Sequence, residues 1–247
     1  MSVALVTGAA RRLGRAIAIE LATSGYDVAI HYRSSQAQAE QLAAEISALG
    51  RKSVLVDADL SDEAQVGSIL PRACAALGPI TALINCASVF EDDRVDNATR
   101  LSWDRHIETN LRAPMVLTQA FAAQLGKDDH GSIVNIIDQA VLNLTPQFVS
   151  YTISKAGLWT LTQTMAQALA PRIRVNAVAP GPSLKAVHQS VENFDQHVRT
   201  TLLQRPSYPQ DIAGAVLYLM RAPSVTGQMI AVDSGQHLAW SKSDLIE

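Results

Sequence analysis

Tyr151 and Lys155 are the residues whose types and spacing point most directly to chemistry. They are four residues apart at the start of a helical stretch that runs to Ala170, and one helical turn places both side chains on the same face. A free phenol has a pKa of about 10, so at neutral pH it is a poor base and a modest acid, and a nearby ammonium shifts it toward useful proton exchange. The pair therefore predicts proton transfer to or from a bound substrate.

A turn near the start of the chain that contains two glycines predicts a dinucleotide site. The apolar run 3–6 leads directly into the turn 7–14, and a helical pattern follows. Gly8 permits a tight turn and Gly14 permits close packing of the helix, whose N-terminal N–H groups and positive dipole bind a pyrophosphate. The alternative is a glycine-rich turn between a strand and a helix that binds no ligand.

The end of the second predicted strand favours NADPH over NADH. A carboxylate about 20 residues past the glycines would bond the ribose 2′-hydroxyl, and this chain has none there. The strand ends in the run 31–35, His-Tyr-Arg-Ser-Ser, while Asp27 lies at its opposite end. Arg33 and the two serines suit a 2′-phosphate, and the alternative for Arg33 is an ordinary solvated surface arginine.

Seven short runs rich in apolar and β-branched residues predict the strands that position these groups. They cover residues 3–6, 28–32, 53–56, 82–85, 133–137, 174–178 and 229–232. Longer stretches rich in Ala, Leu and Gln, with helical spacing, lie between them. Because parallel strands need crossovers and helices supply them, the alternation predicts a parallel sheet covered on both faces. No interdomain linker is found, and the long irregular stretch 179–209 is typical of a functional loop.

Composition excludes several classes of protein. The 247 residues are 48% hydrophobic and 17% charged, which is too apolar for a disordered chain. Twenty Lys and Arg against 23 Asp and Glu give a net charge of −3 without a basic run, so nucleic acid is not an expected partner. The two cysteines, the spacing of the six histidines and the lack of a long apolar segment lead us to expect a cytoplasmic protein without a metal or a membrane span.

A set of motifs spread over nearly the whole chain resembles the short-chain dehydrogenase/reductase family. The set comprises Thr7-Gly8 with Gly14, Asp59, Asn85-Cys86-Ala87-Ser88, Asn110, Tyr151-x-x-x-Lys155, Arg174-Val175-Asn176 with Pro180-Gly181, Thr226-Gly227 and Val232-Asp233-Ser234-Gly235. The resemblance implies an α/β fold with one doubly wound Rossmann-type domain over residues 1–247. Its three αβα layers would surround a mainly parallel seven-stranded sheet.

The same resemblance implies which residues bind NADPH and which are catalytic. Asp59 would contact the adenine, the turn 85–88 would line the cofactor, and Lys155 would hold both the ribose and Tyr151. The implied cofactor-binding residues are Gly8, Arg11, Arg12, Leu13, His31, Tyr32, Arg33, Ser34, Asp59, Leu60, Asn85, Ala87, Ser88, Tyr151, Lys155, Pro180, Gly181 and Ser183. The implied catalytic residues are Asp138, Lys155, Tyr151 as proton donor and Asn110, which would support a proton-relay water.

Three residues depart from the usual pattern of the family. Arg12 replaces the middle glycine of its glycine motif, Asp138 stands 13 residues before Tyr151 where a serine is expected, and Phe90 follows the 85–88 turn by two residues. With these residues the chain resembles the pteridine reductase branch, which includes bacterial dihydromonapterin reductases. The branch implies a pterin or dihydrofolate-type substrate, held by Arg12, Ser88, Phe90, Asp138 and Tyr151.

Elementary chemistry gives a reason for the aspartate. A ketone reductase stabilises a developing alkoxide with a neutral serine hydroxyl, whereas a carboxylate repels that oxygen unless it is protonated. A pterin presents ring nitrogens and an amino-pyrimidine edge, which suit an acid that gives a proton or accepts from N–H. The resemblance implies that Asp138 and Tyr151 deliver a proton to a ring nitrogen while NADPH delivers hydride to the adjacent carbon. Phe90 would stack on the flat ring, and Arg12 would bridge pyrophosphate and substrate.

Two other functions stay open at this point. A carbonyl reductase of the same family, acting on 3-oxoacyl or sugar substrates, would make Asp138 an incidental loop carboxylate, and Phe90 would then belong to the core. A non-enzymatic NADPH sensor would leave Tyr151 and Lys155 without an evident purpose. Assays with pterins, ketones and a broader panel of substrates distinguish the three.

Assembly and the substrate tail follow from the resemblance alone. Relatives are commonly homotetramers built through the helical stretches 99–125 and 149–170 and the C-terminal tail. Ser183 and Leu184 are the residues expected nearest the substrate pocket. Cys86 is expected to be a buried small hydrophobic residue and not a nucleophile.

Overall fold

The computed structural model describes residues 2–185 and 190–239, and its centre is one sheet of seven strands. The strands are β1 (Val3–Val6), β2 (Asp27–Tyr32), β3 (Ser53–Asp57), β4 (Ala82–Asn85), β5 (Gly131–Ile136), β6 (Ile173–Pro180) and β7 (Met229–Val232). Their order in space is β3-β2-β1-β4-β5-β6-β7, and the neighbouring strands pair in parallel. The predicted α/β fold with a seven-stranded sheet is confirmed.

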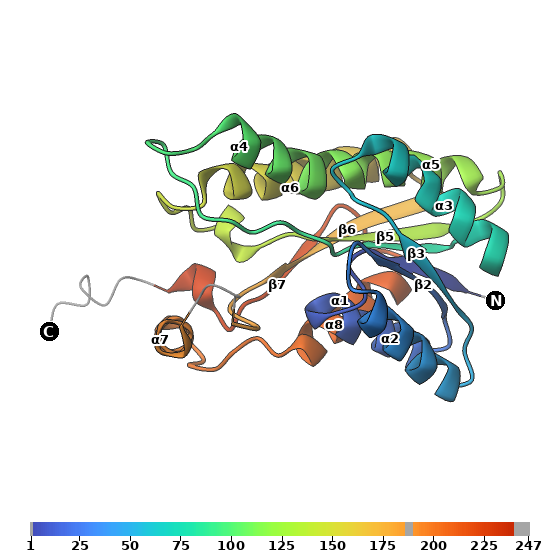
Figure 1. Cartoon of the computed structure of the whole chain (residues 1–247), viewed down its shortest axis with the longest axis horizontal. Coiled ribbons are helices and arrows are strands. Elements are labelled where there is room, and N and C mark those ends of the chain that lie inside the picture. Colours follow the sequence, from blue (N-terminus) through green and yellow to red (C-terminus); the bar gives the residue numbers. More distant parts are fainter. Residues whose placement is uncertain (1, 186–189, 240–247) are drawn as a thin grey trace, which may run out of the picture.

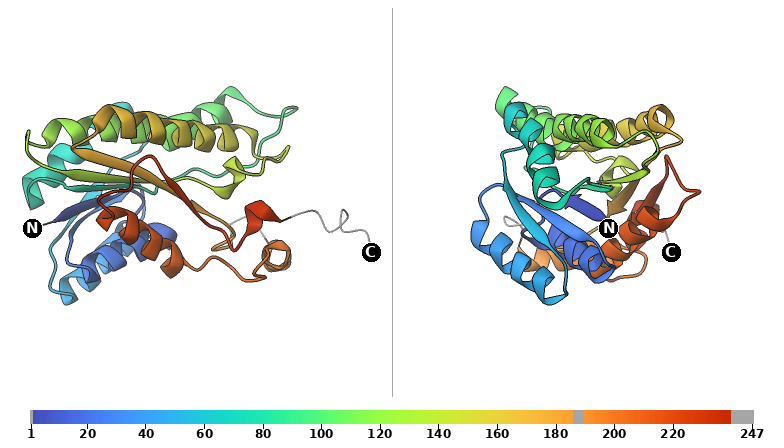
Figure 2. Two further views of the ribbon diagram at one scale, coloured as in Figure 1. Left: turned by 180° about the vertical axis from the view of Figure 1, so that it is seen from behind. Right: turned by 90° about the vertical axis from the view of Figure 1, so that its right-hand side faces the viewer.

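Helices connect the strands and cover both faces of the sheet (Figure 1). One face carries α1 (Arg12–Thr23), α2 (Gln36–Ala48) and α8 (Pro209–Arg221). The other carries α3 (Glu63–Leu77), α4 (Arg100–Ile107), α5 (Ala113–Gln124) and α6 (Val149–Leu169). One end of the molecule holds α7 (Val191–Thr200) and the short helical turn η3 (Gln236–Leu238), as the left view of Figure 2 shows. Two more short turns are η1 (Glu108–Arg112) and η2 (Gln139–Val141).

Alternation along β1 shows how the sheet separates two apolar cores. Ala4 and Val6 face the core beneath α1, α2 and α8, while Val3 and Leu5 face the core beneath α3 and α5. All four side chains are buried. Burial on both faces explains why this strand reads as a continuous apolar run and not as an alternation of apolar and polar residues.

The direction of winding reverses next to β1. From β1 the chain adds β2 and β3 on one side, and it then crosses to place β4 on the other side. The connections on the two sides of β1 therefore run toward opposite edges of the sheet, which opens a crevice at the carboxyl ends of β1 and β4. The glycine turn 7–14 and the turn 85–88 both lie at this edge.

Two predicted segments differ in detail. The stretch 179–209, expected to be irregular, contains the end of β6 and the helix α7, and its residues 186–189 lie outside the described residues. The helical stretch 99–125 is divided, because one turn of π-helix, η1, separates α4 from α5. The C-terminal tail, from residue 240 onward, also lies outside the described residues. Among the described helices, none combines the length and apolar character needed to cross a membrane.

Candidate active site

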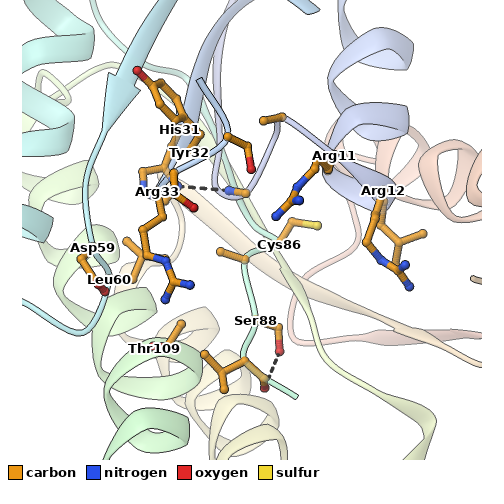
Figure 3. Close-up of a pocket in the computed structure, with 18 of the residues that line it drawn as sticks. Arg11, Arg12, His31, Tyr32, Arg33, Asp59, Leu60, Cys86, Ser88 and Thr109 are labelled. Atoms are coloured by element: carbon orange, nitrogen blue, oxygen red, sulfur yellow. Dashed lines mark hydrogen bonds between the residues drawn. The ribbon is translucent and has the colours of Figure 1, made fainter. Parts of the chain in front are cut away.

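The carboxyl ends of β1 to β4 surround a cleft of about 420 Å³, drawn in Figure 3. Its lining comes from the glycine turn, from the ends of β2 and β3, from the segment after β4 and from the starts of η1 and α6. The lining residues are Gly8, Ala10, Arg11, Arg12, Leu13, Gly14, His31, Tyr32, Arg33, Ser34, Ser35, Ala58, Asp59, Leu60, Cys86, Ala87, Ser88, Val89, Phe90, Thr109 and Tyr151.

Most of the predicted cofactor and substrate residues therefore meet at one cleft. Those that do not line it are Asn85, Asn110, Asp138, Lys155, Pro180, Gly181 and Ser183. Ser35, one of the two serines predicted to meet the 2′-phosphate, also lines the cleft. The lining contains further residues that were not predicted, namely Ala10, Ala58, Val89 and Thr109. Each is adjacent to a predicted residue or lies within a predicted turn, so its position next to a motif could have indicated that it lines the cleft.

The glycine turn owes its shape to two close backbone approaches. Gly8 has a φ of +65°, and a Cβ there would lie 3.0 Å from the Cα of Ala87. A Cβ on Gly14 would lie 2.3 Å from the carbonyl oxygen of Gly8. The side chain of Thr7 holds the opposite wall, since its Oγ1 accepts from the backbone N–H of Cys86 at 2.9 Å and of Ala87 at 3.0 Å. The turn is thus pressed against the end of β4 and can only be built with glycine at these positions.

His31 ties three strands together beneath the cleft. Its Nδ1 accepts the backbone N–H of Gly8 at 3.1 Å, shown as a dashed line in Figure 3, and its Nε2 lies 3.2 Å from the carbonyl oxygen of Ala58. Burial lowers the pKa of His31 to about 4, so at neutral pH the ring is uncharged, accepts at Nδ1 and donates at Nε2. The structure gives this predicted cofactor residue a scaffold role as well.

One end of the cleft carries the groups expected to meet a 2′-phosphate. Arg33 extends across the cleft on the side of Asp59 and Leu60 (Figure 3). Among the described residues no carboxylate forms an ion pair with it. The Ser61 N–H and hydroxyl both bond Asp59 Oδ1, and these hydrogen bonds, helped by the charge of Arg33, lower the pKa of Asp59. The cationic group is therefore available to an anion, and the nearby carboxylate stays ionised.

Asn85 and Cys86 support the cleft from behind. Asn85 donates to Asn135 Oδ1 at 2.8 Å, and Asn135 donates to Thr162 Oγ1 at 2.8 Å, so the chain of hydrogen bonds links β4, β5 and α6. Burial raises the pKa of the Cys86 thiol to about 12. A thiol that keeps its proton is a poor nucleophile, which agrees with the prediction of a small hydrophobic residue.

The acid–base centre brings the end of β5 to the first turn of α6. The hydroxyl of Tyr151 donates to Asp138 Oδ2 at 2.7 Å, and Asp138 Oδ1 accepts the N–H of Ala140 at 2.8 Å. Lys155 donates to the carbonyl oxygen of Ile136 at 2.8 Å, and its Nζ lies 5.8 Å from the centre of the Tyr151 ring. Three of the four predicted catalytic side chains, those of Asp138, Tyr151 and Lys155, are therefore in one place, with the carboxyl directly on the phenol.

The phenol of Tyr151 and the carboxyl of Asp138 both favour their protonated forms. Burial, joined by the neighbouring Asp138, raises the pKa of Tyr151 well above its ordinary value, and burial also raises the pKa of Asp138. Burial lowers the pKa of Lys155 to about 8, against the attraction of Asp138. The expectation that Lys155 shifts the phenol toward proton exchange stays a prediction. The ammonium group bonds Ile136, while the group touching the hydroxyl is an acid.

Asn110 lies in the π-helical turn η1 and holds the segment after β4. Its Oδ1 accepts the N–H of Val89 at 2.8 Å, and its Nδ2 donates to the carbonyl of Val89 at 2.9 Å and to Ser154 Oγ at 3.0 Å. The amide is fully occupied by this clamp, which fixes the start of the Phe90 segment. Support of a relay water by Asn110 stays a prediction.

Two phenylalanines form an aromatic wall beside Tyr151. The ring of Phe90 is partly exposed, stacks on Phe148 at 4.5 Å between centroids, and meets the Tyr151 ring edge-on at 4.7 Å. Phe148 was missed by the sequence reasoning. It lies three residues before Tyr151 and has a left-handed backbone, with a φ of 56°, which no local signal in the sequence indicates.

Arg12 bonds the chain segment after β6. Its two terminal nitrogens donate to the carbonyl oxygens of Leu184 and Lys185, each at 2.9 Å. Gly181 lies in the same segment, and a Cβ there would lie 2.6 Å from the Cα of Asp233. The 180–185 segment thus closes on the glycine turn through Arg12 and on the end of β7 through Gly181. The predicted bridge from Arg12 to a pyrophosphate stays a prediction.

Comparison with known proteins adds independent findings. A family model described as short chain dehydrogenase matches residues 2–195. The chain is 33% identical to the 3-oxoacyl-acyl-carrier-protein reductase of Staphylococcus epidermidis, over 95% of this chain and 98% of that protein.

Solved structures give a second kind of similarity. The FolM alternative dihydrofolate reductase 1 of Brucella canis, complexed with NADP, is 44% identical with a TM-score of 0.93, covering 100% of this chain and 98% of that one. Its counterpart from Brucella suis, also in complex with NADP, is 45% identical with a TM-score of 0.95, covering 98% of each chain.

The burial of His31 predicts a loss of stability in mild acid. The unfolded chain takes up a proton at a pKa of 6.5 and the folded chain only at about 4, so the free energy of unfolding falls as the pH drops from about 6.5 to 4, by at most about 3 kcal/mol. Urea unfolding at several pH values measures it. The variant His31→Asn lacks this titration, so the difference between the two pH profiles isolates His31. Parallel profiles would refute the assignment.

The close approach at Gly14 predicts a large effect for a single methyl group. Gly14→Ala pushes a Cβ into a backbone carbonyl, so we expect a loss of about 1–3 kcal/mol in the free energy of unfolding and weaker binding of NADPH. The control Gly214→Ala, at an exposed position of α8 with open space around it, should stabilise by about 0.5–1 kcal/mol. Urea unfolding and a cofactor titration measure both, and equal effects of the two variants would contradict the packing argument.

Proposed function

The chain belongs to the short-chain dehydrogenase/reductase family, and on that premise we propose that it is an NADPH-dependent reductase that transfers hydride to a C=N bond of a pterin or dihydrofolate-type substrate. The observation that carries the proposal is the hydrogen bond of 2.7 Å between the Tyr151 hydroxyl and Asp138. The family expects a serine at position 138, and an acid in that place suits a ring nitrogen and not an alkoxide. The similarity to the two Brucella dihydrofolate reductases supports the same reading.

The cleft fits a dinucleotide cofactor. The backbone of Gly8 and the first N–H groups of α1 offer donors to a pyrophosphate. Arg33, Ser34 and Ser35 offer a charge and hydroxyls to the 2′-phosphate that distinguishes NADPH from NADH. The Brucella structures contain NADP in an equivalent fold. When bound, NADPH supplies the hydride that reduces the carbon of the C=N bond.

The side chains of this chain supply the proton and the positioning. Tyr151 presents its hydroxyl next to the aromatic wall of Phe90 and Phe148 and donates its proton to the substrate nitrogen. Asp138, whose pKa is raised by burial, replaces that proton from its own carboxyl or holds the phenol in the donating orientation. Phe90 packs against a flat ring through its exposed face.

A carbonyl reductase is the second candidate, and a specific finding favours it. The staphylococcal relative is a 3-oxoacyl-acyl-carrier-protein reductase. The centre in this chain argues against a ketone, because the Asp138 carboxyl would repel the developing alkoxide whenever it is ionised, whereas the serine that the family expects there is neutral. The two candidates predict opposite responses to loss of the carboxyl.

We also propose that the protein is a cytoplasmic homotetramer. Large apolar side chains are exposed on the helices that the family uses for assembly, including Leu101 on α4 and Ile153 on α6. Tyr218 on α8 is exposed as well. Cys74 and Cys86 are both free thiols, as expected for a reducing compartment.

Replacing the acid tests the substrate class. Wild-type protein with NADPH should turn over a dihydropterin or dihydrofolate, and Asp138→Ser should lower kcat for that substrate by about 10²- to 10⁴-fold. The matched control Asp128→Ser, at an exposed position between α5 and β5, should leave it unchanged. Steady-state assays that follow the oxidation of NADPH by its absorbance measure both. Reduction of ketones but not of pterins by the wild type, with ketone turnover rising in Asp138→Ser, would replace our proposal with the carbonyl reductase.

Reversing the charge of Arg33 tests the cofactor assignment. Arg33→Asp removes charge-assisted hydrogen bonds to a 2′-phosphate, so KM for NADPH should rise about 10- to 150-fold while KM for NADH falls. The charge-matched control Arg100→Asp, on the exposed surface of α4, should change neither. Initial rates with both cofactors measure the preference. An unaltered ratio in Arg33→Asp would remove Arg33 from the phosphate site.

A further inference from the structure

A buried network of polar side chains lies directly behind the acid–base centre. Asp93, His106 and Ser150 are all buried, and they come from three places: the segment after β4, helix α4 and the first turn of α6. The reaction outlined above uses none of them. Buried polar groups cost free energy unless they are paired, so a fully paired set of three is a feature that needs an explanation.

The order of donors and acceptors in the network is fixed. Asp93 accepts from the Ser150 N–H at 3.0 Å and from the Ser150 hydroxyl at 2.5 Å. Since that hydroxyl gives its proton to Asp93, its oxygen accepts from Nδ1 of His106, which lies 2.7 Å away. Nε2 of His106 then accepts the backbone N–H of Glu91 at 3.2 Å. One neutral imidazole therefore joins Ser150 to Glu91.

The charge states agree with this order. Burial alone would raise the pKa of Asp93, but the hydrogen bonds from Ser150 and from the Ser102 hydroxyl together outweigh it and the pKa is lowered, so the carboxylate is ionised and accepts. Burial lowers the pKa of His106, against the attraction of Asp93 and Glu91, so the ring is neutral with one N–H. A neutral ring with one donor and one acceptor is the form that the two measured contacts require.

Each end of the network is one residue away from a group that faces the substrate. Ser150 precedes Tyr151, and Glu91 follows Phe90. The His106 ring also packs edge-on against the Tyr151 ring, with centroids 6.0 Å apart. The backbone N–H of Val149 donates to the carbonyl of Asp93 at 3.1 Å, which closes the connection from the other side.

We propose that Asp93, Ser150 and His106 are positioning residues that set the spacing between the proton donor Tyr151 and the aromatic wall at Phe90, and thereby select a flat substrate. The proposal rests on the proposed function, because a ring and a phenol held in edge-on contact at 4.7 Å form one fixed surface, apolar at Phe90 and proton-donating at Tyr151, against which a planar substrate can lie. The Nδ1 contact of His106 holds Tyr151 through Ser150, and the Nε2 contact holds the Phe90 segment through Glu91. A displacement of about 1 Å at such a centre costs up to 10²-fold in rate.

Two isosteric replacements of His106 separate the contacts. His106→Asn keeps a donor at the Nδ1 position and loses the acceptor for Glu91, so we expect kcat near the wild-type value and a rise of about tenfold in KM for the dihydropterin. His106→Gln keeps an acceptor at the Nε2 position and loses the donor to Ser150, so we expect kcat to fall by about tenfold with a small change in KM. The exposed control His130→Asn should change neither.

Hydrogen exchange at the Glu91 amide gives a readout that does not depend on any substrate. It should be faster in His106→Asn than in His106→Gln, because only the Asn variant leaves that N–H without its acceptor. If the wild type reduced no pterin while the exchange rates differed as stated, the proposed function would fail and the network would stand. Equal exchange rates in the two variants would overturn the positioning role. So would changes in kcat and KM that are the same in both variants and are explained by a lower Tm.

A smaller change keeps the test decisive if the histidine variants fold poorly. Ser150→Ala removes one oxygen atom, so the Nδ1 donor and Asp93 lose their shared partner while the backbone N–H of Ser150 still bonds Asp93. We expect kcat to fall by about tenfold with the NADPH dissociation constant unchanged. Wild-type kcat in this variant would contradict the proposal.

Discussion

The contact between a buried phenol and a buried carboxyl is the interaction on which the site depends. Ionising either group here is costly, because burial removes water and the ammonium of Lys155 is bonded to the carbonyl of Ile136. Both groups therefore favour their protonated forms, and a bound substrate with a basic nitrogen is a suitable recipient of the phenol proton. The rest of the fold has to bring β5 and α6 together closely enough to make the contact at 2.7 Å.

The parallel sheet meets this requirement by placing the carboxyl ends of its strands at one edge. Hydrogen bonds between these ends are what turn the edge into a rigid site. Thr7 binds the turn after β4, His31 binds the glycine turn to the end of β3, and Asn135 links β4 to α6. Each of these groups is buried and saturated by neighbours far away in the sequence, so a disturbance at one strand end moves the next. The cofactor cleft and the acid–base centre are in this sense one unit.

The sequence allowed the strands and the glycine turn to be predicted because their signals are local. The run Val3–Val6 is apolar on both faces, and Gly8 and Gly14 stand where backbone must approach backbone. Helix α7 was not predicted, although Val191, Phe194 and Val198 have the spacing of one helix face, because the helix is short, mostly polar and lies in a stretch rich in Pro and Ser/Gln. The contact of Phe90 with Phe148 and the chain from Asp93 to His106 join residues far apart in sequence, and such pairs leave no periodic trace. The contact of Lys155 with the carbonyl of Ile136 was not predicted for the same reason, since it depends on the position of β5.

This chain can be similar in sequence to a ketone reductase and still reduce a C=N bond. About a third of the residues are shared with the staphylococcal enzyme, and sheet packing, the glycine turn and the Tyr151–Lys155 pair account for what a family must keep. A serine hydroxyl at position 138 can donate one hydrogen bond to an oxygen that gains charge, whereas a carboxyl on the same backbone can also supply the proton that a ring nitrogen takes up when hydride is added to the adjacent carbon. With an aromatic wall formed by Phe90 and Phe148 beside Tyr151, one exchanged side chain and one added ring move the fold from tetrahedral alkoxides to flat heterocycles.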